Sequence, residues 1–349
     1  VVGAGVAGLS VAAALSEHAT VALIEREGQP AYHSSGRSAA VYIEGYESQV
    51  VAALTRASRD FFFQQPGEFC EHPLLHSMGG MTVASARQLN AFEQHIATWQ
   101  PGNPELREIS IDAALQKLPV LNPDYIKRVC FDPSMQGIDV HELLSGFRRQ
   151  LQARAGALVL GQRVVGLARD AGGWLINTAA DDMKPSSGQQ ISARCVVNAA
   201  GSWCEQLAAL AGLPAVGLTP MRRTAVLCSV PDSARHWPMV HDCENTVYFK
   251  PDAGALMVSP ADEHPSAPCD AQPEDLDVAI ALDRLQRVTT MTVERVQHRW
   301  AGLRTFAPDR NPVLGFDPLL EGFYWLGGQG GFGVQTSPAV SRLAADELL

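Results

Sequence analysis

The sequence lacks the features that define several large classes of protein. Its seven cysteines are odd in number and include no C-x-x-C pair, so neither a disulfide framework nor a zinc site is favoured. No stretch reaches the about 18 consecutive apolar residues of a membrane-spanning helix, so we expect no stable membrane insertion. Basic residues are in deficit: the net charge of −10 argues against binding to nucleic acid or to anionic membranes.

The N-terminal run also lacks the marks of a secretory signal. Residues 1–15 are apolar, but no basic stretch precedes them. Because the sequence opens inside a predicted strand, we expect a short segment to precede Val1. Reduced, mostly buried cysteines suit a cytoplasmic protein. With 349 residues the chain exceeds one typical core, which predicts two domains.

A glycine motif stands at the start of the chain. Gly3, Gly5 and Gly8 form G-x-G-x-x-G between the end of an apolar strand and a predicted helix over 9–17. Such glycines allow a tight turn, a close approach of a pyrophosphate and tight helix–strand packing, while the helix N-terminus faces the phosphate charge. A second predicted strand, 20–24, ends at Glu25, where a ribose hydroxyl needs an acceptor. Together these features predict a site for an adenine dinucleotide.

Two later segments favour FAD over NAD as this dinucleotide. Residues 195–201 predict a buried strand ending in small residues, and 327–333 form a glycine-rich loop before a helix opened by Thr336 and Pro338. The segment 3–8 and the loop 327–333 are both glycine-rich and both lead into helices, which is more than an NAD site needs. The first would hold the pyrophosphate of FAD, and the last the isoalloxazine. Backbone N–H groups of 333–335 and the positive helix end would stabilise the negative charge of a reduced flavin.

Periodicity and turn residues predict the other elements. They are helices over 47–63, 89–99, 141–155, 202–211 and 275–288, strands over 69–75, 81–84, 157–160, 163–167, 174–178 and 293–302, a hairpin over 246–258 with its turn at 251–254, and a polar linker over 181–190. Strand-rich inserts separate the cofactor-like segments, so the two domains should be interleaved.

Six segments together resemble one known family. They are 3–8, 25–26, 35–39, 196–201, 302–304 and 330–333. In this order they are similar to FAD-dependent oxidoreductases of the D-amino-acid oxidase type, over almost the whole chain. Stretches 69–75, 249–254, 300–304 and 329–337 resemble bacterial D-arginine dehydrogenases in detail.

The resemblance implies an α/β fold with α+β parts. A Rossmann-like FAD-binding domain (1–45, 140–218 and 303–349) is interleaved with a substrate domain (46–139 and 219–302) whose antiparallel sheet lies over the flavin. The implied cofactor contacts are Gly3, Gly5, Ala7, Gly8, Glu25, Arg26, Ser34, Ser35, Gly36, Arg37, Ser38, Ala39, Val164, Ala200, Gly201, Trp203, Gly330, Gly331, Phe332, Gly333, Val334, Gln335 and Thr336. Because no cysteine follows Cys269, a thioether link in the last part of the chain is excluded and non-covalent FAD is expected.

The family holds the carboxylate of its substrate with arginines and tyrosines. The matching residues are Tyr46, Arg223, Tyr248 and Arg304, to which Gln335 is added as a catalytic candidate. A guanidinium pairs with a carboxylate through two charge-assisted hydrogen bonds, which agrees with this reading. The resemblance implies oxidative deamination of a D-amino acid: hydride passes from Cα to flavin N5, and the imine hydrolyses to a 2-oxo acid and ammonia. Oxygen or a quinone would reoxidise the flavin.

Departures from the family pattern concern the substrate side chain. Gly80 stands where the D-arginine enzymes have an acidic residue, and Val41 and Ile43 replace a histidine and a threonine, so D-arginine is a doubtful substrate. Glu44 could supply a carboxylate, and His241 could line the pocket, although each suits a structural role better. An N-methyl or cyclic amino acid, a 2-hydroxy acid, or a flavin-binding subunit without activity stay open as alternatives, as does the oligomeric state.

Overall fold

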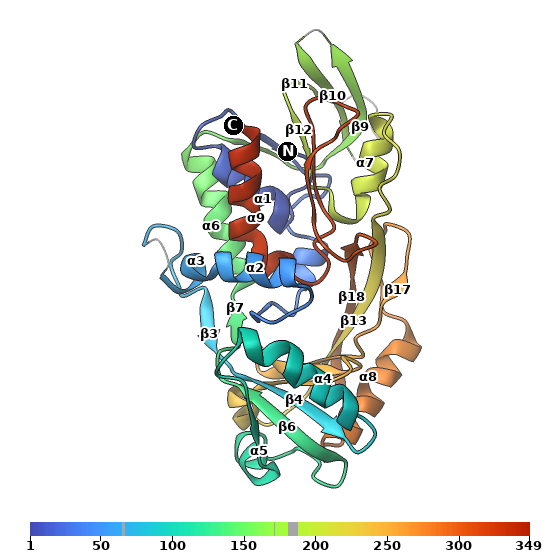
Figure 1. Cartoon of the computed structure of the whole chain (residues 1–349). Helices are drawn as coiled ribbons and strands as arrows, with labels where there is room; N and C mark the ends of the chain where they lie inside the picture. The colour runs from blue at the N-terminus through green and yellow to red at the C-terminus, as the bar shows by residue number, and fades with distance from the viewer. Residues whose placement is uncertain (65–66, 171, 181–187) are drawn as a thin grey trace.

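The chain forms two halves, each built around its own sheet (Figure 1). The structure is a computed structural model that describes residues 1–64, 67–170, 172–180 and 188–349. Residues 181–187 of the predicted linker lie outside this range. Both termini lie in the upper half in Figure 1, although the lower half is made of chain segments that come between them.

The upper half contains a mainly parallel sheet. Val2 forms single parallel bridges with Ile24 and with Asn198, so the glycine motif follows directly from the centre of this sheet. The order is β8-β1-Val2-β12-β20-β19, and only β19 runs antiparallel to its neighbour. These strands are β1 (Ala22–Ile24), β8 (Ala157–Val159), β12 (Val196–Asn198), β19 (Val313–Phe316) and β20 (Phe323–Gly327).

Three helices pack beside this sheet in Figure 1: α1 (Val6–Leu15), α6 (Val140–Ala153) and α9 (Gly333–Leu348). Helix α1 is buried almost all round, because α6 and α9 both pack against it. The predicted helix over 141–155 is confirmed as α6. Its N-cap Asp139 accepts a hydrogen bond from the backbone N–H of Glu142, and its apolar stripe is buried.

The lower half contains a nine-stranded sheet. Its order is β17-β13-β16-β15-β14-β4-β6-β5, with β18 paired to β13. Every pair is antiparallel, as predicted, except β14, which runs parallel to β4. The strands are β4 (Gly80–Ser85), β5 (Arg107–Ile109), β6 (Ile126–Asp132), β13 (Thr219–Cys228), β14 (Met239–Asp242), β15 (Tyr248–Asp252), β16 (Ala255–Ser259), β17 (His264–Pro265) and β18 (Val296–Phe306).

Helices cover one face of the nine-stranded sheet and leave part of the other for the site. Side chains of α5 (Ile111–Lys117) and α8 (Asp275–Val288) share a buried apolar cluster with Val226, Phe249 and Val258 of the sheet. Their neighbours Ala225, Tyr248 and Met257 belong to a cluster on the opposite face, because successive side chains of a strand alternate.

The remaining elements lie outside these two sheets. They are the sheets β11-β10-β9 and β2-β7-β3, with β2 (Val41–Tyr42), β3 (Leu75–Ser77), β7 (Gln136–Ile138), β9 (Gln162–Asp170), β10 (Gly173–Ala180) and β11 (Gln190–Ala193), helices α2 (Gln49–Ala57), α3 (Arg59–Gln64), α4 (Leu89–Trp99) and α7 (Cys204–Leu210), and the 3-10 turns η1 (Ser34–Arg37), η2 (Gln100–Gly102), η3 (Gly201–Trp203) and η4 (Asp232–His236). Within the described residues, no helix is both long and apolar enough to cross a membrane.

Several predicted boundaries were wrong. The predicted helix over 47–63 breaks at Ser58, whose hydroxyl donates to Leu54 O and accepts from Ala339 N of α9. The predicted strand over 69–75 shrinks to the start of β3, because Phe69 and Leu74 are apolar for packing against α6 rather than for pairing. The predicted strand over 293–302 runs from 296 to 306 instead, past the predicted domain boundary at 302.

The last helix starts three residues before the predicted cap at Thr336. It begins at Gly333, so Pro338 lies inside it. A proline has no N–H to give to the carbonyl four residues earlier. Ser337 supplies that donor instead, since its hydroxyl hydrogen-bonds Val334 O at 3.0 Å. The hairpin of β15 and β16 is confirmed, with Ala253 and Gly254 at positive φ in its tight turn.

Candidate functional site

A cavity of about 580 Å³ lies between the two sheets. One wall consists of loops at the carboxyl ends of the parallel strands, where ligands of open α/β sheets bind. The opposite wall is formed by β13, β15, β16 and β18. Of the predicted site residues, those that line the cavity are Gly3, Gly5, Ala7, Glu25, Arg26, Ser34, Ser35, Arg37, Ser38, Ala39, Val164, Ala200, Gly201, Trp203, Arg223, Tyr248, Arg304, Gly330, Gly331, Gly333 and Val334.

The glycine motif builds one end of the cavity from backbone. Gly3 has φ +99°, and a Cβ there would lie 2.4 Å from Ala199 O. A Cβ on Gly8 would lie 1.7 Å from Gly3 O, so Gly8 serves the packing of the turn and does not line the cavity. Gly5 is the N-cap of α1 and offers no capping side chain. The first turn of α1 therefore faces the cavity with its positive end.

Two side chains from other segments hold this turn in place. Glu25 is 8% exposed, and its carboxylate accepts hydrogen bonds from Ala4 N at 2.7 Å and Glu27 N at 2.9 Å. The hydroxyl of Ser35 accepts from Val6 N at 2.9 Å. Each Glu25 oxygen retains a second lone pair, so the residue can still receive a ribose hydroxyl.

The η1 segment joins the two halves beside the cavity. Arg37 donates to Ala301 O at 2.8 Å and pairs with Asp270 at 2.6 Å, while Ser34 donates to Leu303 O. Arg37 thus holds β18 against η1 as well as lining the cavity. Nothing in the sequence pattern around 34–39 distinguished this docking role from cofactor contact.

The structure separates some predicted cofactor residues from the cavity. Phe332 and Thr336 are buried in the packing around α9, Gly36 faces Ala31 O, and neither they nor Gln335 line the cavity. The side-chain oxygen of Gln335 accepts a hydrogen bond from Ile43 N, and its NH2 group donates to Ile43 O and to the hydroxyl of Thr55. Gln335 therefore fixes the chain just after β2, and it does not line the cavity.

Sequence reasoning missed Gln329, which lines the cavity within the last glycine-rich loop. Its side-chain Nε2 is buried and has no hydrogen-bond partner among the described residues. An unpaired buried amide is costly, which makes Gln329 an exception among the buried polar groups of this loop. Its place between Gly328 and Gly330 was the signal that could have revealed it.

Arg304 stands at the opposite end, on β18, and among the described residues its side chain has one hydrogen-bond partner. Its Nη2 lies 3.4 Å from the hydroxyl of Tyr248. A Cβ on Gly331 would lie 2.8 Å from Arg304 Nη1 and 3.2 Å from the hydroxyl of Tyr46, so only glycine lets the last loop approach this pair. Arg304, Tyr248 and Tyr46 are brought together as the resemblance implied, although Tyr46 does not itself line the cavity.

The two tyrosines differ in electrostatic environment. Burial raises the pKa of Tyr46, and the nearby charge of Arg304 offsets this only in part. Burial acts on Tyr248 in the same direction, but Arg304 and Arg223 together outweigh it and lower the pKa of Tyr248. The field at Tyr248 is therefore strongly positive, and it suits an anionic group of a ligand.

Arg223 is held differently from Arg304. Its Nε donates to Asp262 O at 2.7 Å and its Nη2 pairs with Glu263 at 2.9 Å. Asp262 in turn accepts from the backbone N–H and the hydroxyl of Thr224, at 2.7 and 2.9 Å. The loop that follows β16 thus clamps the guanidinium of Arg223 at the cavity wall.

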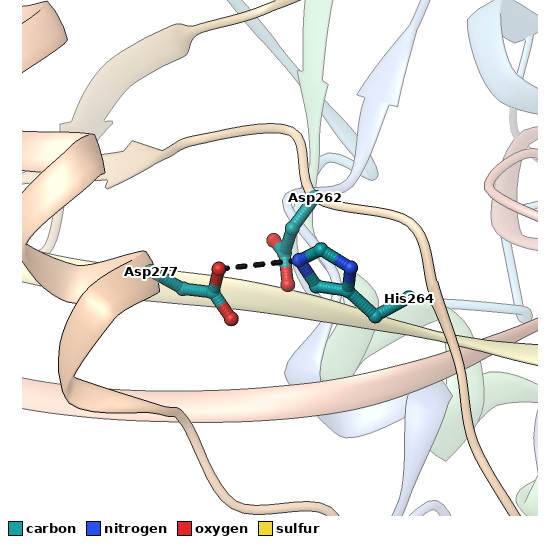
Figure 2. A group of neighbouring side chains, drawn as sticks. All are labelled: Asp262, His264 and Asp277. Atoms are coloured by element: carbon teal, nitrogen blue, oxygen red, sulfur yellow. Dashed lines mark hydrogen bonds and ion pairs between the residues drawn. The ribbon is translucent and has the colours of Figure 1, made fainter.

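Asp262 also belongs to a group of three potential metal ligands with His264 and Asp277, shown in Figure 2. His264 Nε2 lies 3.3 Å from Asp277 Oδ1, while the other Asp277 oxygen pairs with Arg222 at 3.0 Å. Asp262 already accepts hydrogen bonds from Thr224, and Asp277 is already paired with the positive charge of Arg222. The group therefore stabilises the loop after β16 and is a poor cation site.

The residues singled out for the substrate side chain lie in an apolar environment. A Cβ on Gly80 would lie 1.9 Å from the sulfur of Met135, which is buried with Met239 and Met257. His241 is also buried: the hydroxyl of Thr82 links its Nε2, at 2.9 Å, to the Nε2 of His95, at 3.0 Å. Glu44 bonds to Tyr42 and pairs with Arg59, away from the cavity lining.

The fold and the cavity define a class: a dinucleotide-binding redox protein with an anion-binding end. Comparison with known proteins gives the family. Residues 1–347 match the model of the FAD dependent oxidoreductase family (DAO), and the chain belongs to it. FAD is therefore its cofactor, and the glycine turn and Glu25 fit it. The expected non-covalent attachment stays a prediction.

Relatives share the fold at low sequence identity. Glycine oxidase of Pseudomonas aeruginosa is 26% identical over 99% of this chain and 93% of its own length. FAD-dependent oxidoreductase domain-containing protein 1 of Bos taurus is 24% identical over 78% of this chain, and the match spans only 62% of that protein. The structure of L-proline dehydrogenase from P. horikoshii superposes with a TM-score of 0.84 at 18% identity, covering 99% of this chain and 91% of that one. The finer likeness to D-arginine dehydrogenases stays a prediction.

Proposed function

We propose that the protein oxidises the Cα–N bond of an amino acid with an apolar side chain, and that Arg304 holds the substrate carboxylate. The observation that carries this proposal is the placement of Arg304. It faces the FAD cavity, and within the described residues it forms no ion pair. A half-buried guanidinium without an anion is unfavourable, and a carboxylate of the substrate would remove that cost.

In this proposal Arg304 and the side chains around it orient the substrate. The guanidinium and the hydroxyl of Tyr248 receive the carboxylate, and Gly331 lets the last glycine-rich loop come close to them. Fixing the carboxylate restricts the rotation of the substrate and presents its Cα–H to the cofactor. When bound, FAD takes up the electron pair that leaves the amine as it becomes an imine. The imine then hydrolyses to a 2-oxo acid.

No described side chain at this end is an evident base for the amine. Tyr248 is the titratable neighbour of Arg304, and its hydroxyl serves the carboxylate. The substrate amine must therefore bind in its neutral form, so kcat/KM should rise with pH until the amine is deprotonated.

We propose an apolar side chain for the substrate because of the residues that surround Gly80. Met135 fills the space that an acidic side chain would need, and it is buried with Met239 and with Met257, of which Met257 lines the cavity. Thioether side chains adapt to irregular apolar groups. D-arginine is accordingly a poor substrate in this proposal, while D-configuration itself rests on the family resemblance.

A second candidate is oxidation of glycine or of a small N-methyl amino acid. Glycine oxidase is a relative over nearly the whole length of both chains, which favours it. The two candidates share Arg304 and differ in whether the methionine cluster contacts the substrate.

Anaerobic bleaching of the flavin absorbance tests the proposal. The panel consists of D- and L-leucine, D-arginine, glycine, N-methylglycine, proline and 2-hydroxy-4-methylpentanoate. Rapid bleaching by D-leucine with little by D-arginine is the expected result. Bleaching by glycine or N-methylglycine alone selects the second candidate. Bleaching by the 2-hydroxy acid alone, or by none, contradicts amine oxidation, and the last outcome favours a flavin-binding subunit.

A further inference from the structure

Two arginines, Arg223 and Arg304, line the cavity at its β18 end, and among the described residues only Arg223 has a carboxylate within ion-pair distance. Arg223 is paired with Glu263 at 2.9 Å, whereas Arg304 has the hydroxyl of Tyr248 at 3.4 Å and no carboxylate within ion-pair distance among the described residues. The two positions are close in the sheet: Arg223 pairs with Gly302 of β18, two residues before Arg304. Side chains two residues apart on a strand share a face.

Glu263 belongs to an alternating row of charges at the rim of the cavity. Arg310 donates to both of its oxygens at 3.1 and 3.2 Å and also pairs with Glu47 at 3.3 Å. The row Arg223, Glu263, Arg310, Glu47 holds two positive and two negative charges and sums to zero. Burial alone would raise the pKa of Glu263, but Arg310 and Arg223 lower it, so Glu263 is ionised at neutral pH.

The loop that carries Glu263 is fixed. Asp262 is 8% exposed and its carboxylate accepts two hydrogen bonds from Thr224, while Arg284 donates to Pro260 O at 2.8 Å. The backbone at Glu263 is therefore held in place, and its side chain leaves Arg223 only by breaking its own bonds to Arg223 and Arg310. A ligand that needs the charge of Arg223 has to compete with a carboxylate already in place.

We infer that Glu263 is a specificity-determining residue that compensates Arg223 and limits the site to substrates with one carboxylate. Among the described residues Arg304 has no carboxylate within ion-pair distance, and Glu263 and Glu47 act on its charge only from farther away, so we expect one anionic group to bind it directly. A second carboxylate would meet Glu263, and burying an unpaired or repelled charge is strongly unfavourable. The inference rests on the proposed function for its substrate class, but it concerns the binding of carboxylates and can be measured without turnover.

The test uses two inert carboxylates and the FAD-loaded protein. 3-Methylbutanoate carries one carboxylate and an apolar body, and succinate carries two carboxylates. Binding of each is followed by the change in the flavin absorption spectrum. The wild type should bind 3-methylbutanoate more tightly than succinate. Glu263→Gln removes the charge and leaves one acceptor oxygen for Arg223 and Arg310, while its NH2 group cannot accept from a guanidinium. It should improve succinate binding about tenfold while changing 3-methylbutanoate binding less than about threefold.

Two further variants separate specificity from general damage. Glu274→Gln is the matched control, because Glu274 pairs with Arg222, the neighbour of Arg223 on the opposite face of β13. It should leave both affinities unchanged. Glu263→Asp keeps the charge and should retain the wild-type preference.

Three results would overturn the inference: a wild-type preference for succinate, an unchanged ratio of the two affinities in Glu263→Gln, or an equal gain for succinate in Glu274→Gln. Failure of the proposed function has a different signature. In that case no amino acid bleaches the flavin, whatever the carboxylate preference of the variants.

Discussion

The two ends of the cavity recognise their ligand by different means. At the α1 end, glycines and other backbone groups line the cavity, Glu25 and Ser35 hold that backbone in shape, and Glu25 keeps lone pairs for a ribose hydroxyl. At the β18 end, side chains from separate strands, Arg304 and Tyr248, form the surface that a substrate meets. The first end depends on local chain geometry, while the second depends on strand pairing between residues far apart in sequence. The two ends should therefore fail in different ways when they are altered.

The largest effect is expected at the glycine end, from Gly8→Ala. A Cβ there would lie 1.7 Å from Gly3 O, and neither backbone segment can yield without losing the turn. We expect a loss of about 4 kcal/mol or more in unfolding free energy, or a protein that does not fold. Thermal melting and the FAD content of the purified protein measure this. Gly28→Ala is the control, since nothing lies within 4 Å of a Cβ there. Equal behaviour of the two variants would contradict the account.

Arg304→Met should produce the next largest effect, and only on the substrate. Loss of the charge-assisted hydrogen bonds to a carboxylate costs about 3–4 kcal/mol, so kcat/KM should fall by about 10²–10³-fold. FAD content and melting temperature should stay near those of the wild type, because Arg304 forms no ion pair with the described residues. Loss of FAD together with activity would mean that Arg304 supports the cofactor end instead.

Two buried histidines, His95 of α4 and His241 of β14, predict a pH effect on stability. Burial, with a smaller contribution from His241, lowers the pKa of His95 to about 3. In the unfolded chain a histidine titrates near 6.5, so between these values only the unfolded state takes up the proton and stability falls as the pH falls. From pH 7 to 5 this should cost about 2 kcal/mol.

Urea titrations of the wild type and of His95→Gln at several pH values measure this dependence. The variant should lose less stability on acidification than the wild type does. If the unfolding free energies of the two proteins fell in parallel with pH, His95 would be solvated in the folded protein. Burial of His95 would then not explain any loss of stability in acid.

The smallest effect is expected from Tyr248→Phe. Loss of one hydroxyl contact should weaken 3-methylbutanoate binding about fivefold, or about 1 kcal/mol. Because Arg304 and Arg223 lower the pKa of Tyr248 against the effect of burial, wild-type affinity should decline as alkaline pH ionises the hydroxyl and places a negative charge beside Arg304. The variant should lack this decline. Its persistence in Tyr248→Phe would assign it to another group.

The contrast between the two ends also explains what the sequence could predict. The glycine turn, Glu25 and the loop before α9 are local patterns, and the structure places all three at the cavity. The pairing of Arg223 with Gly302, the clamp from Asp262 and Glu263, and the filling of Gly80 by Met135 join distant segments. No local spacing encodes them. The family resemblance located Arg304 and Tyr248, but the different states of the two arginines required the strand register.

The glycine-rich loop at 327–333 shows the same limit within a single motif. Its glycines predicted a cofactor loop, and they line the cavity. Its predicted helix start at Thr336 was wrong, because Ser337 replaces the N–H donor that Pro338 lacks. The amide of Gln335 faces Ile43 and Thr55, since α9 packs on α2. The orientation of a helix residue depends on tertiary packing that the motif does not contain.

The most direct measurement of the central claim is a crystal structure of the FAD-loaded protein with 3-methylbutanoate. We predict that the carboxylate binds the guanidinium of Arg304 within hydrogen-bond distance and contacts the hydroxyl of Tyr248, while Arg223 keeps its ion pair with Glu263. A carboxylate bound to Arg223 in place of Glu263, or an anion that avoids Arg304, would contradict the account.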